Sequence, residues 1–148
     1  MISDRIFDVK KKARVFVAFD SVQSAKVDFA GAMLKNAGGV NIPSDYAEFL
    51  KNTNGMIATP FEFYGTEVQK RNNIPPYNFP NIVDVNMVFL KDKNPLMVNR
   101  IVVGMVYFDL IIFDGKDKKY KLLHRTNFAV VSEFKNFDDV LGYVIKSL

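Results

Sequence analysis

The sequence predicts an α+β domain with a central antiparallel β-sheet, a meander, flanked by helices. The chain runs from helical patterns through mixed elements to a block of strand patterns and a last helix. Helices and strands in separate blocks favour α+β over an alternating βαβ fold. A length of 148 residues fits one domain. We therefore predict a single domain over residues 1–148, with residues 1–20 as an N-terminal helical extension.

The N-terminal third is predicted to be helical. Residues 4–19 begin polar and basic and end in an apolar run, which fits the buried end of a helix or a short strand. A second helix is expected to begin at Ser21 or Ser24 as its cap and to run to about Asn36. Gly38 and Gly39 then end it, because glycine adopts the left-handed conformation at little cost.

A third helix is predicted after Pro43, since proline favours the first turn of a helix. Tyr46 and Leu50 lie four residues apart and belong to one apolar stripe. Asn54 and Gly55 form a turn signal that stops the helix.

A short strand and a long loop are predicted next. Residues 61–64 alternate like a strand, and Gly65 closes it. Residues 69–80 have the composition of a loop, with three prolines and three asparagines. A helix is predicted to follow, whose apolar positions are Ile82, Val85, Met87, Phe89 and Leu90.

The remaining chain predicts four antiparallel strands and a terminal helix. Residues 100–106 and 108–113 are rich in β-branched side chains. A glycine-containing turn then leads to a strand from Tyr120, and a last strand covers residues 128–134. Asn136 is predicted to cap the final helix. The buried stripe of that helix is predicted to be Phe137, Val140, Leu141, Val144 and Leu148.

Composition excludes several classes of protein. Hydrophobic residues make up 49% of the chain and charged residues 24%, which is typical of a globular domain. With no cysteine, the chain has no disulfide, thiol nucleophile or thiolate zinc site. The N-terminus lacks the apolar segment of a signal peptide, and the apolar stretch 101–113 is shorter than the about 20 residues of a membrane helix. We expect a cytoplasmic protein without membrane contact.

The sequence contains no common phosphate-binding, dinucleotide-binding, hydrolase or zinc-protease motif. The single histidine, His124, has no evident partner for acid–base work. The pairs of acidic residues have local structural explanations. Asp45 and Glu48 are expected on the exposed side of a helix, and Asp114 flanks a turn. We therefore expect no catalytic residue, no metal and no cofactor.

The net charge is +4, with a pI near 9.2. The dense basic run is Lys10 to Lys12 with Arg14, and a looser group extends from Lys116 to Lys121. Such runs fit either a solvated surface or an electrostatic docking patch. Aromatic residues follow core spacing, so we expect no direct contact with nucleic acid.

One segment is a candidate for binding a partner. The loop after residue 69 carries Arg71 and Tyr77, residue types enriched at protein interfaces. Tyr64 and Gly65 end the strand before it. The alternatives are an ordinary surface loop and a docking edge that includes Tyr64, Gly65, Arg71 and Tyr77.

Several strings together resemble the SUKH superfamily, which includes fungal regulators of cell-wall glucan synthesis and bacterial immunity proteins. The resemblance covers about residues 24–148 and lies mainly in the strings at 42–46, 49–50, 54–55 and 61–65. It extends to a strand with Gly104 and to the strand at Tyr120. The residues that match the pattern are Pro43, Tyr46, Leu50, Asn54, Gly55, Glu62, Gly104 and Tyr120.

The resemblance implies a non-enzymatic module that binds a partner protein. Bacterial members are largely inferred to neutralise toxins, and the partner would then be a toxin domain. An alternative is a regulator of cell-wall glucan synthesis that acts through protein contacts. A further alternative is a small-ligand binder or enzyme with a pocket between sheet and helices. The basic pI weighs against an inhibitor that mimics nucleic acid.

Overall fold

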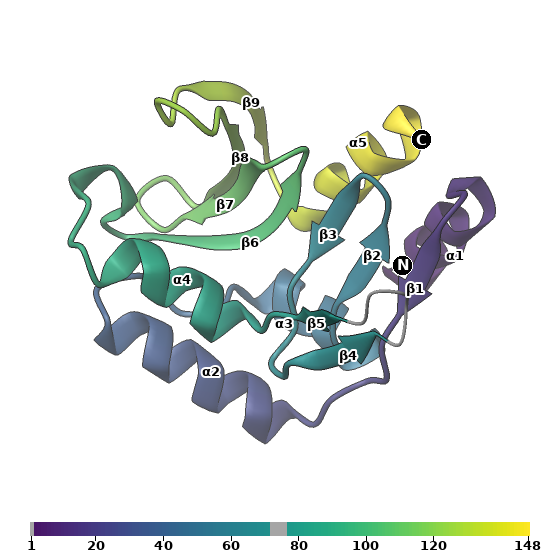
Figure 1. The fold of residues 1–148 in the computed structure, drawn as a ribbon, viewed down its shortest axis with the longest axis horizontal. Coiled ribbons are helices and arrows are strands. Elements are labelled where there is room, and N and C mark those ends of the chain that lie inside the picture. The colour runs from purple at the N-terminus through teal and green to yellow at the C-terminus, as the bar shows by residue number, and fades with distance from the viewer. Residues whose placement is uncertain (1, 72–76) are drawn as a thin grey trace.

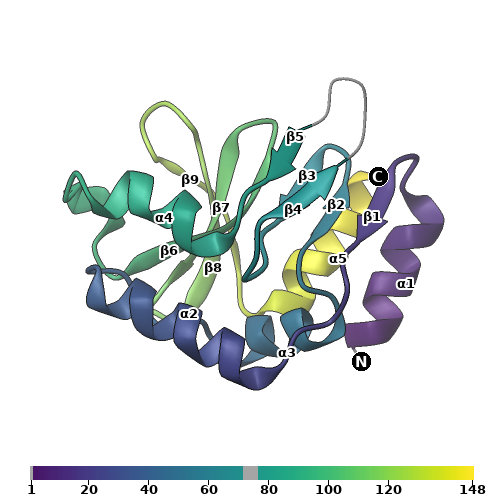
Figure 2. The same cartoon turned by 60° about the horizontal axis from the view of Figure 1, so that its bottom comes forward.

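A seven-stranded antiparallel sheet forms the centre of the molecule, and helices pack on it (Figures 1 and 2). The computed structural model describes residues 2–71 and 77–148, except for the side chains of Arg71 and Tyr77. The predicted α+β class with a central antiparallel sheet is confirmed. No helix in this described part of the chain is long and apolar enough to span a bilayer.

The N-terminal region forms α1 (Ile2–Lys12), β1 (Phe16–Ala18), α2 (Ser24–Asn36) and α3 (Ser44–Asn52). The apolar tail after α1 is thus a strand, one of the two predicted alternatives. The predicted serine cap of α2 is wrong: Gln23 occupies that position, without a side-chain hydrogen bond. Pro43 directly precedes α3, as predicted, and its carbonyl accepts the first helical hydrogen bond, from Ala47.

The middle of the chain contains more strands than predicted. A hairpin consists of β2 (Met56–Ala58) and β3 (Phe61–Phe63), and the first of these strands was not predicted. The region predicted as a loop forms a second, separate hairpin of β4 (Gln69–Arg71) and β5 (Tyr77–Phe79). Residues 72–76, which belong to the predicted loop, lie outside the described residues. The helix α4 (Ile82–Leu90) follows as predicted.

The C-terminal half contains the predicted meander. After a 3₁₀ turn (Pro95–Met97), the strands are β6 (Arg100–Val106), β7 (Asp109–Asp114), β8 (Lys119–Leu123) and β9 (Val130–Phe134). The full strand order is β1-β2-β3-β6-β7-β8-β9, so three earlier strands extend the meander. Helix α5 (Phe137–Ser147) is capped by the Asn136 side chain, as predicted.

An aromatic cluster joins α3 and α5 to the sheet. The Phe137 ring lies 4.9 Å from Tyr46, 5.0 Å from Phe49, 5.5 Å from Phe63 and 5.5 Å from Tyr120, measured between ring centroids. Edge-to-face and tilted contacts at these distances are favourable beyond the buried area alone. The predicted apolar stripes of both helices therefore meet in one core.

The Tyr46 hydroxyl ends inside this core and fixes the backbone around it. It donates to the carbonyl of Tyr64 at 2.6 Å, and the carbonyl oxygen of Val103 lies 3.0 Å from the same hydroxyl. Burial raises the pKa of the Tyr46 hydroxyl well above its ordinary value, so the hydroxyl remains a donor. Tyr46 thus links α3 to β3 and β6 in addition to packing its helix.

The buried face of helix α4 includes a polar residue that the apolar pattern did not predict. Ile82, Asn86 and Leu90 are its buried residues, whereas Val85 and Met87 are half-buried. The Asn86 carboxamide donates to the Val102 carbonyl at 2.8 Å and accepts from the Val102 N–H at 2.7 Å. The register of β3 stops at Gly104, so Asn86 pairs with a stretch of β6 that β3 does not reach.

Close backbone approaches explain two glycines of the motif. A Cβ on Gly104 would lie 2.3 Å from the Glu62 carbonyl oxygen, so a side chain there would push β3 away from β6. A Cβ on Gly65 would lie 2.2 Å from the carbonyl oxygen of Asn54. The Asn54 side chain accepts a hydrogen bond from the Thr66 N–H at 2.8 Å, which holds the two loops together.

Candidate protein-binding site

The predicted partner-binding residues near β3 have little exposed surface. Tyr64 is 2% exposed, its ring stacks on Phe79, and its hydroxyl donates to Glu62 Oε2 at 3.1 Å. Burial, with the Glu62 carboxylate, raises the pKa of this hydroxyl above its ordinary value. Gly65 is also buried. Both residues thus shape the core beneath the β4–β5 hairpin and offer a partner little surface in this structure.

The other two predicted residues, Arg71 and Tyr77, face each other in the register of β4 and β5. Their side chains lie outside the described residues. The docking edge that includes them therefore stays a prediction.

The titratable side chains Asp45 and His124 make local contacts that give each a structural role. Asp45, predicted to be exposed, is half-buried and accepts hydrogen bonds from the Tyr120 hydroxyl at 2.6 Å and the Phe137 N–H at 2.8 Å. His124 is exposed, and its Nδ1 lies 2.8 Å from the Thr126 hydroxyl. Among the residues that the structure describes, no cluster of three or more His, Asp or Glu side chains is suited to a metal ion.

A buried ionic cluster lies where the sequence indicated a solvated turn. Asp114 is buried and contacts Arg100 Nε at 3.0 Å and Lys121 Nζ at 3.1 Å. Burial alone would raise the pKa of Asp114, but hydrogen bonds from the Lys116 N–H, Lys121 and Arg100 outweigh it and lower that pKa. Lys121 is also buried, so this part of the basic group is structural.

Two surface grooves run beside α2. One has a volume of about 470 Å³ and a polar lining that includes the exposed residues Ser21 and Gln23. The other, about 460 Å³, lies between α2 and α4 and is lined by apolar side chains such as Phe29. Lys26 and Glu67, which form an ion pair, line both grooves. Both open to solvent beside the helices.

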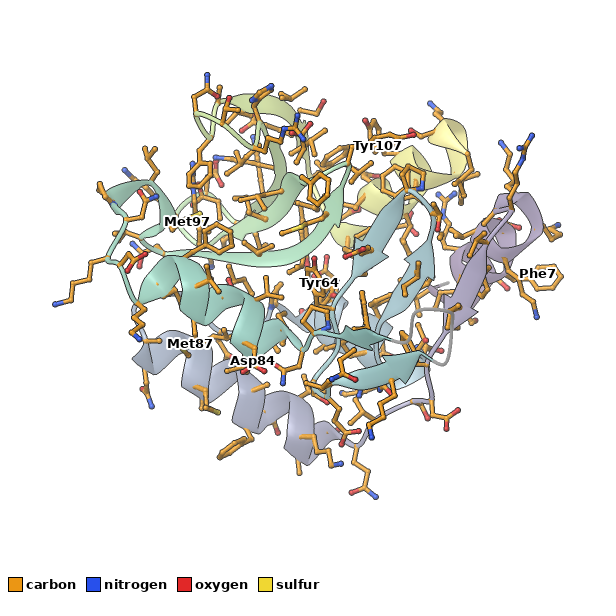
Figure 3. The ribbon with its side chains drawn as sticks, in the orientation of Figure 1. Phe7, Tyr64, Asp84, Met87, Met97 and Tyr107 are labelled. Atoms are coloured by element: carbon orange, nitrogen blue, oxygen red, sulfur yellow. The ribbon has the colours of Figure 1, made fainter. Side chains whose placement is uncertain are left out.

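Two exposed aromatic residues form the turn between β6 and β7. Tyr107 is 74% exposed and Phe108 is 71% exposed. Val106 pairs with Asp109, so the connection has two residues. Both have a positive φ, 50° for Tyr107 and 71° for Phe108, as in a type I′ turn. Phe108, predicted to begin a strand, is thus a turn residue. Figure 3 shows Tyr107 at the upper edge of the sheet, whereas Tyr64 lies inside.

Several strand ends lie next to this turn. The register places Phe61 opposite Val106, so the turn at Thr59 and Pro60 neighbours Tyr107. The Thr59 N–H donates to the Val15 carbonyl, which brings the start of β1 into the same row. In Figure 1 these turns follow one another along the upper edge of the molecule. We call this row of turns and strand ends the hairpin-tip edge. Its members are Val15, Thr59, Pro60, Tyr107, Phe108, Arg125, Thr126 and Asn127.

Arg125 completes the hairpin-tip edge on the β8–β9 side. Its backbone N–H donates to Asp109 Oδ1 at 3.0 Å, which ties the two turns together. Its guanidinium carbon lies 6.0 Å from the centre of the Phe108 ring, within the range of a cation–π contact. Tyrosine and arginine are the residue types that most often dominate protein interfaces. Chemically, this arrangement fits the anchoring of a protein partner.

The comparisons with known proteins give the family of the chain. No curated protein matches the sequence. A family model, SUKH_6, described as SMI1-KNR4 cell-wall, matches residues 32–138. The match lies within the predicted range 24–148 and includes α3, the strands around Gly104 and the hairpin-tip edge from Thr59 to Asn127. The chain therefore belongs to the SUKH superfamily.

Proposed function

We propose that this chain is a non-enzymatic protein-binding module that acts as an immunity protein, neutralising a toxin through the hairpin-tip edge. The observation that carries the proposal is the pair Tyr107 and Phe108, two large exposed aromatic residues on one tight turn. Membership of the SUKH superfamily supports a role in binding proteins, since its bacterial members are largely inferred to be immunity proteins.

The strained backbone of this turn supports a binding role for its two aromatic side chains. A residue with a side chain costs about 1–2 kcal/mol in the left-handed region. Asn-Gly would form the same type I′ turn with less strain. Strained residues of this kind cluster at functional sites, where the surrounding structure holds them. Here β6 and β7 hold Tyr107 and Phe108 in position without covering them.

The test uses the full chain and the protein products encoded directly beside its gene. Each product is expressed alone and with the chain, and growth and the dissociation constant are measured. We expect one product to arrest growth, and the chain to bind it and restore growth. If no neighbouring product binds the chain or is neutralised by it, the immunity role is rejected.

A turn variant separates binding from folding. In the double variant Tyr107→Asn with Phe108→Gly, we expect unchanged or higher stability, because the turn is relieved of strain. We expect binding to weaken by at least about 30-fold, the loss that marks a hot spot. Phe29→Ser, which removes a 69% exposed ring on α2, serves as the matched control and should leave binding unchanged. Unchanged binding in the double variant would rule out this edge.

The family description also favours a second candidate, because it names the cell wall. In that case the chain regulates cell-wall glucan synthesis through protein contacts. Deletion of the gene should then change the glucan content of the wall and the sensitivity of the cells to wall stress. An unaltered wall and an unaltered stress response would remove this candidate.

A further inference from the structure

We infer that the partner meets the hairpin-tip edge with an acidic surface that also holds an apolar cavity for Tyr107 and Phe108. This inference rests on the proposed function and names the chemistry of its partner. Three observations support it: the charges around the two rings, the length of the edge, and the way the rings protrude from it.

Basic side chains outnumber acidic ones around the hairpin-tip edge. The last turn of α1 leads through Arg14 to Val15, so its lysines closely precede the β1 end of the edge in the chain, and Lys12 Nζ donates to the Ile145 carbonyl of α5 at 3.0 Å. Asp109 is the acidic residue of the central turn, and it already accepts the Arg125 N–H. Asp8 pairs with Lys11 at 3.7 Å. The basic residues in the described part of this region are Lys10, Lys11, Lys12, Arg14 and Arg125.

The spacing of the sheet places the charges around the rings. From β1 to β8 there are five strand steps, which at about 4.8 Å each make an edge about 24 Å long. Tyr107 and Phe108 lie inside this row, with Arg125 on one side and Arg14 on the other. Apolar anchors within a charged rim are the usual anatomy of a protein interface. An acidic partner would be attracted by the rim and would bury the rings.

The shape of the edge favours a protein over a nucleic acid. Proteins that bind single strands line a basic groove with aromatic rings on which bases stack. Here the rings protrude from a turn. The two grooves described above adjoin α2, which lies at the opposite side of the molecule in both views. A protruding aromatic pair fits a concave protein surface.

The first experiment tests the chemistry with defined probes. Random displayed peptides are selected against the immobilised full chain, and oligothymidylate is titrated separately. We expect the selected peptides to be rich in Asp and Glu beside apolar residues. Their binding should weaken when salt rises from about 0.1 to 1 M, which shortens the Debye length from about 10 to 3 Å. Oligothymidylate should bind weakly, without dependence on Tyr107 or Phe108.

Charge reversal then tests the position. Arg125→Glu and Arg14→Glu should each weaken the selected peptides by about 10-fold or more, through the loss of a favourable pair and a new repulsion. Lys35→Glu, an exposed position on α2, is the matched control and should change binding by less than about 2-fold. The double variant Tyr107→Asn with Phe108→Gly should abolish the enrichment.

The outcomes distinguish this inference from the proposed function. Acid-rich peptides that require Arg125 and the two rings support the inference, even if no neighbouring gene product binds. A toxin that binds the edge but ignores salt and Arg125→Glu overturns the inference and leaves the proposed function intact. Peptides without acidic bias also overturn it. Tight binding of oligothymidylate through Tyr107 and Phe108 overturns it in favour of a nucleic acid.

Discussion

The Tyr120 hydroxyl donates a hydrogen bond to Asp45 Oδ1 over 2.6 Å and thereby joins β8 to the start of α3. The other oxygen of the same carboxylate accepts the Phe137 N–H, the first of α5. One side chain thus connects the sheet with two helices that lie far apart in the sequence. Tyr120 belongs to the residues by which the chain resembles its superfamily, and this contact gives it a structural role.

The first prediction removes this hydroxyl. Tyr120→Phe should lower the free energy of unfolding by about 1–2 kcal/mol, because a hydrogen bond to a charged group is lost while the ring stays packed. Urea unfolding at neutral pH measures the change. Tyr143→Phe is the control, since the described residues show no hydrogen bond of the Tyr143 hydroxyl. Equal losses in both variants would mean that the Asp45 contact adds nothing.

The second prediction concerns the buried asparagine of α4. Asn86→Leu should lower the free energy of unfolding by about 2–4 kcal/mol, because two buried backbone groups of Val102 lose their partner. Chemical denaturation measures the loss. Asn36→Leu, at an exposed position on α2, controls for the change in side-chain type. A stable Asn86→Leu protein would show that water or a shift of β6 satisfies Val102.

The third prediction compares two glycines. Gly104→Ala should cost about 3 kcal/mol, since the new Cβ would overlap the Glu62 carbonyl and the Phe63 ring. Gly142→Ala should instead add about 0.5–1 kcal/mol, because Gly142 lies inside α5 and a Cβ there meets no atom within 4 Å. Thermal unfolding of both variants shows directly whether each substitution lowers or raises the stability. A stabilised Gly104→Ala protein would contradict the close approach of β3 and β6.

The elements that the sequence predicted well carry their signal in side-chain spacing. In α3, Tyr46 and Leu50 repeat at helical intervals, and in α5 Phe137 and Val144 do so. Spacing failed where a polar residue is buried for its hydrogen bonds. Asn86 interrupts the apolar pattern of α4, so its burial was missed although the predicted positions Ile82 and Leu90 are buried.

The sequence indicated a strand connection at Tyr107 but gave no sign that this connection is the candidate site. Tyr107 and Phe108 lie within an apolar run from Ile101 to Phe113, where neither residue is a typical turn former. Phe108 was therefore predicted as the first residue of a strand, whereas Tyr107 fell between two predicted strands. Its exposure depends on the two-residue connection between Val106 and Asp109, which tertiary structure decides. Arg125 lies beside Phe108 because of the strand register, and the spacing of residues in the sequence does not give that register.

The last prediction uses the lowered pKa of Asp114. An unfolded aspartate titrates near pH 3.9. Because the folded pKa lies lower, the unfolded state takes up protons first as pH falls. The stabilising contribution of Asp114 is therefore complete above about pH 4 and is lost as pH falls through the folded pKa. The difference in free energy of unfolding between the wild type and Asp114→Asn should be constant from about pH 5 to 7 and shrink below about pH 4.

Urea unfolding across this range measures that difference for both proteins. Asp28→Asn, at an exposed position on α2, controls for the loss of one negative charge. A parallel test removes the partner: Lys121→Met should destabilise the protein by about 1–3 kcal/mol at neutral pH, because Asp114 keeps Arg100 but loses one buried hydrogen bond. A difference for Asp114→Asn that grows as pH falls would reverse the sign of the linkage and contradict the ionic cluster.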